Sequence, residues 1–131
     1  MKKQLFIFAL ALTLLVLLLA GCNTTPGPED VYQQYWEACS QGKFSQAEVF
    51  LADNAREFSQ SLGVCALTHD AINTLEAQKG NPPRTFSGEP LVNAHEKATS
   101  ITWFDDQGNI ATVILVLIDG DWKVTEATWS R

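Results

Sequence analysis

The chain has 131 residues and carries nine Lys and Arg against fifteen Asp and Glu, which gives a formal net charge of −6 at pH 7. Nucleic-acid binding requires basic side chains that neutralise phosphates, so this balance argues against a nucleic-acid partner. It argues equally against a basic surface that docks on anionic lipid.

The chain begins with a segment typical of export. An apolar run from Leu5 to Leu19 follows two lysines, and Leu19-Ala20-Gly21-Cys22 closes it. These four residues resemble the lipobox of bacterial lipoproteins. The resemblance implies that residues 1–21 are a signal peptide and that Cys22 carries the lipid. An uncleaved membrane helix is the alternative, although the run is at the short end of the roughly 17–25 residues that such a helix needs.

We therefore expect three parts: the signal peptide, a lipid anchor with a short linker at 22–28, and one domain at 29–131. The lipid would hold the protein in the bacterial cell envelope. The lipid would sit either in the outer face of the cytoplasmic membrane or in the outer membrane.

Apolar spacing and helix start and stop signals predict four helical segments in the first half of the domain. They begin at Pro28, at Ser45, at Asp53 or Asn54, and at Thr68. The second carries a capping box, Ser45 with Glu48, and Phe44 is placed to pack on Val49 as a hydrophobic staple. Its buried face is Ala47, Phe50 and Leu51. The first helix carries an apolar stripe, the third runs through two large apolar residues, and the fourth carries two more: Val31, Tyr35, Trp36 and Cys39; Phe58 and Leu62; Ile72 and Leu75.

From Arg84 onward, β-branched and aromatic residues and turn signals predict three antiparallel strands at about 91–104, 110–119 and 122–129. Residues 85–89 could add an edge strand. Because 110–118 is apolar at almost every position, we expect that strand to be buried on both faces. Helices followed by strands predict an α+β domain with N-terminal helices packed on a curved antiparallel sheet.

Three segments, 31–39, 42–47 and 119–124, resemble the nuclear transport factor 2-like superfamily, and within it a family of small bacterial lipoproteins of unknown function. The similarity covers 29–128. It implies a cone in which the curved sheet wraps around helices and encloses a cavity. The superfamily contains isomerases, dehydratases and non-catalytic binding domains, so the resemblance leaves the activity open.

No linear catalytic motif is present, and we predict no catalytic residue, metal ligand or cofactor. We expect His69 to cap a helix or face solvent, and His95 to face solvent from a strand. Tyr32, Tyr35 and Glu57 would be the first residues to consider in an enzyme. A calcium site in the 105–109 loop is less favoured than a polar hairpin, because the loop is shorter than an EF-hand.

Four tryptophans could contribute to a ligand site, but Trp36 and Trp122 occupy positions where core packing explains them. Trp103 and Trp129, near the ends of the sheet, are the candidate ligand or partner contacts.

With Cys22 committed to lipid, Cys39 and Cys65 remain as an even pair, and export favours their oxidation. We predict a disulfide between them. Two buried thiols are the alternative.

The sequence thus favours a lipid-anchored cell-envelope binding or interaction domain without catalysis, whose partner is a small apolar ligand or an envelope protein. A small cone-fold enzyme of isomerase, dehydratase or hydrolase type, acting on an envelope metabolite, is the alternative. A purely structural subunit and a homodimer also stay open.

Overall fold

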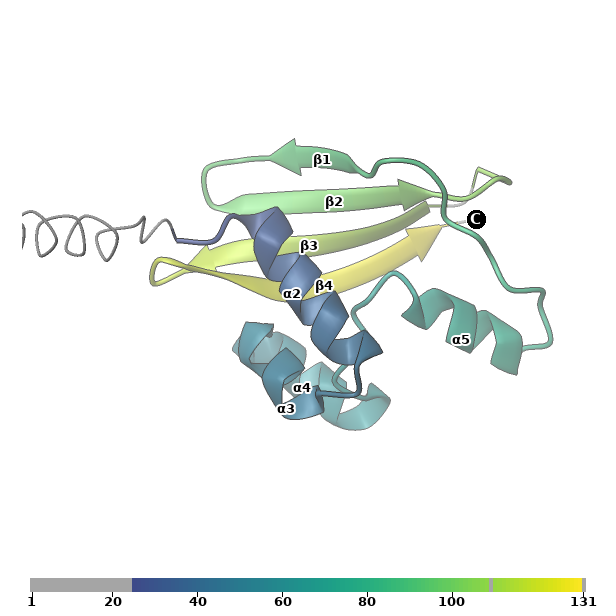
Figure 1. Cartoon of the computed structure of the whole chain (residues 1–131), viewed down its shortest axis with the longest axis horizontal. Helices are drawn as coiled ribbons and strands as arrows, with labels where there is room; N and C mark the ends of the chain where they lie inside the picture. The colour runs from purple at the N-terminus through teal and green to yellow at the C-terminus, as the bar shows by residue number, and fades with distance from the viewer. Residues whose placement is uncertain (1–24, 109, 131) are drawn as a thin grey trace, which may run out of the picture.

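The computed structural model describes residues 25–108 and 110–130, with the side chains of Ile72, Asn73, Glu76 and Trp129 left out (Figure 1). Within these residues the chain forms helices first and strands afterwards. The helical elements are α2 Pro28–Ser40, α3 Phe44–Ala47, the 3-10 helix η1 Glu48–Phe50, α4 Asp53–Leu62 and α5 Ala71–Gln78. The strands are β1 Leu91–Ala94, β2 Ala98–Phe104, β3 Ile110–Ile118 and β4 Asp121–Ser130. The predicted signal peptide and Cys22 lie outside the described residues.

Helix α2 begins at Pro28 as predicted, and its start is held by the Asp30 carboxylate, which accepts the backbone N–H of Gly27 at 3.3 Å. It ends ahead of Gly42, whose φ of 69° lies in the left-handed region that glycine adopts without strain. A residue in that region cannot continue an α-helix, so the glycine marks where α2 ends.

The capping box predicted at Ser45 is wrong. The carbonyl of Lys43 accepts the N–H groups of both Gln46 and Ala47 at 3.0 Å, so α3 starts before Ser45. Ser45 therefore sits inside the first turn and makes no cap. Phe44 and Val49 are both exposed, so the staple does not form either.

The bounds of α4 match the prediction, and Gly63 ends the helix with a φ of 97°. Ala55 and Ser59 are the buried residues of this helix, whereas Phe58 and Leu62 are exposed. Because residues three apart share one side of a helix, the larger apolar side chains lie at the exposed edge of that side.

The four strands form one antiparallel sheet in the order β1-β2-β3-β4. The predicted single strand at 91–104 is two strands, because the polar residues 95–97 form a turn in which the His95 N–H binds the Ala98 carbonyl at 2.8 Å. His95 is exposed as expected, but in this turn and not on a strand. The predicted edge strand at 85–89 is reduced to one bridge between Phe86 and Asp105.

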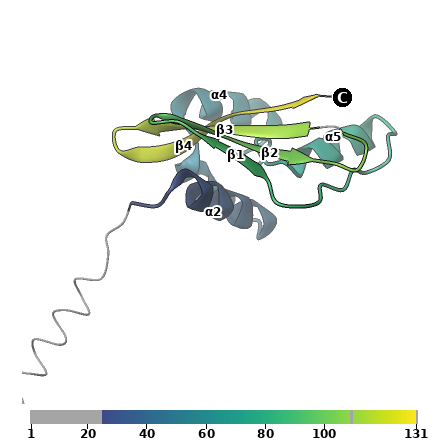
Figure 2. The same cartoon turned by 90° about the horizontal axis from the view of Figure 1, so that it is seen from above.

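Helix α2 crosses one face of the sheet, and α4 packs beside β4 (Figures 1 and 2). Leu51 joins the two halves of the domain, since it forms a parallel bridge with Val124 and the next residue, Ala52, donates its N–H to the Val124 carbonyl at 2.8 Å. The fold is therefore α+β, with helices packed on an antiparallel sheet.

Burial along β3 alternates. Ala111, Val113 and Leu115 are buried under the helices, and the residues between them are only partly covered. The prediction that this strand is buried on both faces is wrong, because the residues on its second face are only partly covered. No helix among the described residues is both long enough and apolar enough to span a membrane.

Candidate functional site

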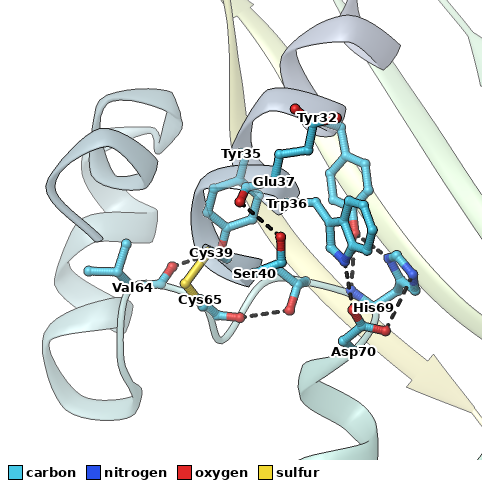
Figure 3. Close-up of a disulfide and its surroundings, with 11 residues drawn as sticks. Tyr32, Tyr35, Trp36, Glu37, Cys39, Ser40, Val64, Cys65, His69 and Asp70 are labelled. Carbon is cyan, nitrogen blue, oxygen red and sulfur yellow. Dashed lines mark hydrogen bonds and ion pairs between the residues drawn. A yellow bond between two sulfur atoms is a disulfide. The ribbon is translucent and has the colours of Figure 1, made fainter. Parts of the chain in front are cut away.

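One face of α2 holds the segment that connects α4 to α5 (Figure 3). Tyr32, Tyr35, Trp36 and Cys39 recur at helical spacing and point toward residues 63–70. Each of the four makes a specific bond to that segment. The connection, which is irregular backbone, is thereby fixed at several points along its length.

The two cysteines predicted to pair are bonded in the structure. The sulfur atoms of Cys39 and Cys65 lie 2.11 Å apart, and their Cα atoms are 5.6 Å apart. Beside them, the Tyr35 hydroxyl donates to the Val64 carbonyl at 2.7 Å. Tyr35 is fully buried, and this burial raises the pKa of its hydroxyl above the ordinary value.

His69 is hydrogen-bonded to Tyr32 through both its ring and its backbone. The Tyr32 hydroxyl accepts the backbone N–H of His69 at 3.1 Å and lies 2.6 Å from its Nδ1. The hydroxyl has one hydrogen, and we assign it as the donor to Nδ1. The neutral ring then carries its proton on Nε2, which lies 3.5 Å from Oδ1 of Asp70.

Aromatic rings surround this histidine. Its ring stacks on Trp103 with centroids 4.5 Å apart and on Trp36 at 5.9 Å, and Tyr32 packs on Trp103 at 5.0 Å. We call Tyr32, Trp36, His69 and Trp103 the ring cluster. The prediction that His69 caps a helix or faces solvent is wrong, since its side chain is only 17% exposed.

Burial sets the protonation of the ring cluster. It raises the pKa of Tyr32 and lowers the pKa of His69, and the charge of Asp70 opposes the second shift only in part. Both groups are therefore neutral at pH 7.

A groove lies beside the ring cluster, between the end of α2, the end of α4 and helix α5. Its volume is about 580 Å³, and the disulfide forms part of its wall. Most of the described lining is apolar. The larger apolar side chains are Trp36, which the groove shares with the ring cluster, Phe44, Phe58, Leu62, Val64 and Leu75, and Ala127 of β4 also lines it. Phe58 is 49% exposed and Leu62 is 55% exposed, so the groove presents uncovered apolar surface.

Asp70 is the one ionisable side chain among the described residues that line the groove. Its Oδ2 accepts the indole N–H of Trp36 at 2.6 Å. The side chain is 56% exposed, so the rest of the carboxylate faces solvent and the groove. Asp70 thus belongs to the groove on one side and to the ring cluster on the other.

The structure separates the tryptophans predicted to contact a ligand from this groove. Trp103 is partly buried on β2 and does not line the groove. Trp129 pairs with Ala111 through the backbone, and its side chain lies outside what the structure describes. Its role stays a prediction.

The three residues considered for catalysis do not meet at one point. Tyr32 and Tyr35 are buried and hydrogen-bonded within the protein, whereas Glu57 is exposed on α4. In the 105–109 loop, the buried Asp105 accepts the N–H of Gln107 at 2.9 Å. Among described residues, no group of three or more His, Cys, Asp and Glu could hold a metal.

Sequence reasoning missed the exposed apolar stripe of α4 and the role of Asp70. A signal was present, because Ala55 and Ser59 precede Phe58 and Leu62 by three residues each, so all four lie on one side of α4, the small side chains in its buried part and the large ones at its exposed edge. A helix that packs closely buries small residues. The large apolar side chains of α4 then remain exposed and can contact a ligand.

No protein-family model, no curated protein and no solved structure matches this chain significantly. Its site is therefore interpreted from its own geometry.

Proposed function

We propose that this protein is a lipid-anchored binding domain of the bacterial cell envelope that holds an apolar molecule, without catalysis, in the groove between α2, α4 and α5. The observation that carries the proposal is the groove itself: about 580 Å³, lined mainly by apolar side chains, some of them half exposed. Ligand sites typically have volumes of about 300–1,000 Å³ and apolar walls with a few polar groups.

The rigidity of the groove also supports binding. One wall is the segment at 63–70, which the Cys39–Cys65 disulfide and the Tyr35 hydrogen bond hold against α2. A wall that is ordered before the ligand arrives needs no ordering upon binding, which increases affinity.

The ring cluster supports a structural role for His69. Its Nδ1 binds Tyr32, its Nε2 faces Asp70, and its ring faces stack on two indoles. A general base needs a free nitrogen within reach of its substrate. Here both nitrogens already have partners within the protein.

The second candidate is the small cone-fold enzyme, and the Tyr32–His69–Asp70 chain is the observation in its favour. The Tyr32→Phe variant separates the two candidates. An enzyme would lose turnover of its envelope metabolite while keeping affinity, whereas a binding domain would keep its affinity and have no turnover to lose.

The anchor is proposed from the residues before the described domain. Cys22 precedes Pro28 by a linker that spans about 20 Å at most, so the groove would stand close to the membrane. We expect Cys22→Ala to release the protein from membranes or to leave an unprocessed precursor. Retention of a processed variant on membranes after an alkaline wash would contradict the anchor.

The nuclear transport factor 2-like cone is the fold that we propose for this arrangement. It is supported by helices that precede an antiparallel sheet and cover one of its faces, with the strands in the order β1-β2-β3-β4.

The groove is tested with a matched pair of leucine variants in the full chain, reconstituted in lipid nanodiscs. Leu62, in the groove, and Leu91, on β1 away from it, are 55% and 60% exposed. The probe is decanol with a photoreactive diazirine in its tail, and labelling of the protein is followed by mass spectrometry. We expect Leu62→Ser to weaken labelling about fivefold or more, and Leu91→Ser to leave it unchanged. Equal effects of the two variants would contradict the proposal.

A further inference from the structure

The charge of the groove indicates the chemistry of its ligand. We infer that the groove selects amphiphiles with a cationic head, such as an alkylammonium or alkylamidinium group, which pairs with Asp70 while the apolar tail lies on α4 and α5. This inference rests on the proposed function of the groove as a binding site.

The first support is the geometry of the Asp70 carboxylate. Its Oδ2 receives the Trp36 indole N–H at 2.6 Å, and its Oδ1 lies 3.5 Å from His69 Nε2. Two oxygens together offer about four acceptor positions, so further donors can bind. The side chain is 56% exposed, which gives a ligand access to those positions.

The second support is that nothing nearby in the ring cluster neutralises this carboxylate. Burial lowers the pKa of His69, so the imidazole next to Asp70 is uncharged at pH 7. The Trp36 indole is a neutral donor. Both residues orient Asp70 and leave its negative charge in place.

The third support is the rest of the lining. Ser40, Thr68, Thr74 and Gln78 supply neutral polar groups, and the described lining contains no Lys, Arg or His. An anionic head would find no counter-charge there. The protein's formal charge of −6 would further repel an anion.

The apolar tail has an evident place. Phe58 and Leu62 lie one turn apart on α4, and Leu75 faces the same groove from α5. A single chain lying between these helices would cover side chains that water now contacts. A head at Asp70 and a tail along α4 together define an amphiphile.

The experiment compares three heads on one tail, using the full chain in nanodiscs of zwitterionic lipid. The probes are diazirine-bearing decyl chains that end in an ammonium, a hydroxyl or a carboxylate group. The quantity measured is the ratio of the apparent Kd of the alcohol to that of the amine, compared between variants so that partitioning into lipid cancels. We expect a ratio of about ten for the wild type, as for a partly exposed charged hydrogen bond.

Three variants test whether that ratio of Kd values depends on Asp70. Asp70→Asn keeps the shape and an acceptor for Trp36, and should bring the ratio to about one. Thr74→Lys puts a cation on an exposed groove position without changing Asp70 and should make the carboxylate probe bind more tightly than the amine. Glu57→Gln removes a charge from α4 outside the groove and should leave the ratio unchanged.

The two proposals fail in different ways. If the alcohol binds in the groove but the three heads bind equally, or if Asp70→Asn keeps the amine preference, the inference on cationic heads is wrong and the binding site stands. If Leu62→Ser does not weaken binding of the alcohol, the assignment of the groove as the binding site is wrong. An equal loss of amine preference in Glu57→Gln would also overturn the role of Asp70.

Discussion

The ring cluster and the groove are both built on α2, yet they differ in how far the protein itself covers their side chains. In the ring cluster, the aromatic faces stack on one another and the hydroxyl of Tyr32 makes two hydrogen bonds within the protein. In the groove, the apolar side chains of α4 are half exposed. One region is complete without a ligand, and the other is not.

This difference shows why aromatic content alone does not locate a binding site. Trp103 is large and aromatic, but His69 and Tyr32 already contact its ring. Phe58 and Leu62 are ordinary helix residues, but nothing covers them fully. Uncovered apolar surface is the better indicator of a ligand site.

The largest expected effect comes from removing the disulfide that holds the groove wall. Cys39 and Cys65 are 26 residues apart, and a crosslink of that span contributes roughly 3–4 kcal/mol in the chain-entropy model. We expect the double Cys→Ala variant to lose about that much unfolding free energy in urea titrations, and to bind decanol less well. A loss below about 1 kcal/mol would show that the wall does not depend on this bond.

The ring cluster should be next in sensitivity. Tyr32→Phe removes a hydroxyl that binds both the backbone N–H and Nδ1 of His69, so both groups lose this hydrogen-bond partner. We expect a loss of about 2 kcal/mol, against about 1 kcal/mol for Tyr35→Phe, which removes one bond to Val64. Urea denaturation checks the order. The reverse order would contradict the tautomer and bonding assigned to His69.

A pH effect should distinguish the ring cluster from the rest of the molecule. Because burial lowers the pKa of His69 in the folded state, the unfolded chain binds more protons between that pKa and about 6.5. Stability should therefore be fully present above pH 6.5 and decrease as the pH falls below it. We expect the urea midpoint to drop from pH 7.5 to 5.5 by less in His69→Gln than in the wild type. An identical drop in both would show that His69 does not contribute.

The groove should respond least in stability. Leu62 is more than half exposed, so Leu62→Ser should change the unfolding free energy by less than about 1 kcal/mol. Binding of the decanol probe should fall nonetheless. A stability loss as large as that of Tyr32→Phe would place Leu62 in the core and not in a ligand site.

Much of the fold was predictable from the sequence because its signals are local. Pro28 and Gly63 mark helix ends, and the β-branched and aromatic residues and the turns mark β3 and β4. The predictions failed where the same residues allow two alternative local structures. At Ser45 a cap competed with a backbone turn at Lys43, and the backbone hydrogen bonds to the Lys43 carbonyl determined the helix start.

The site was less predictable because it depends on contacts between distant residues. The pairing of Cys39 with Cys65 followed from their number and compartment. That Tyr32 reaches His69, 37 residues away, required the tertiary arrangement. The exposure of Phe58 likewise depends on which face of α4 packs on β4. The helix pattern places Ala55 and Phe58 on one side of α4 and does not show which part of that side faces β4.

The most direct test of the account is where a neutral apolar probe attaches. The full chain in nanodiscs is irradiated with diazirine-bearing decanol, and the labelled residues are located by tandem mass spectrometry. The account predicts label on α4 and α5, in the peptides that contain Leu62 and Leu75. Label concentrated on β2 around Trp103 would contradict it, because that ring belongs to the cluster that we regard as closed.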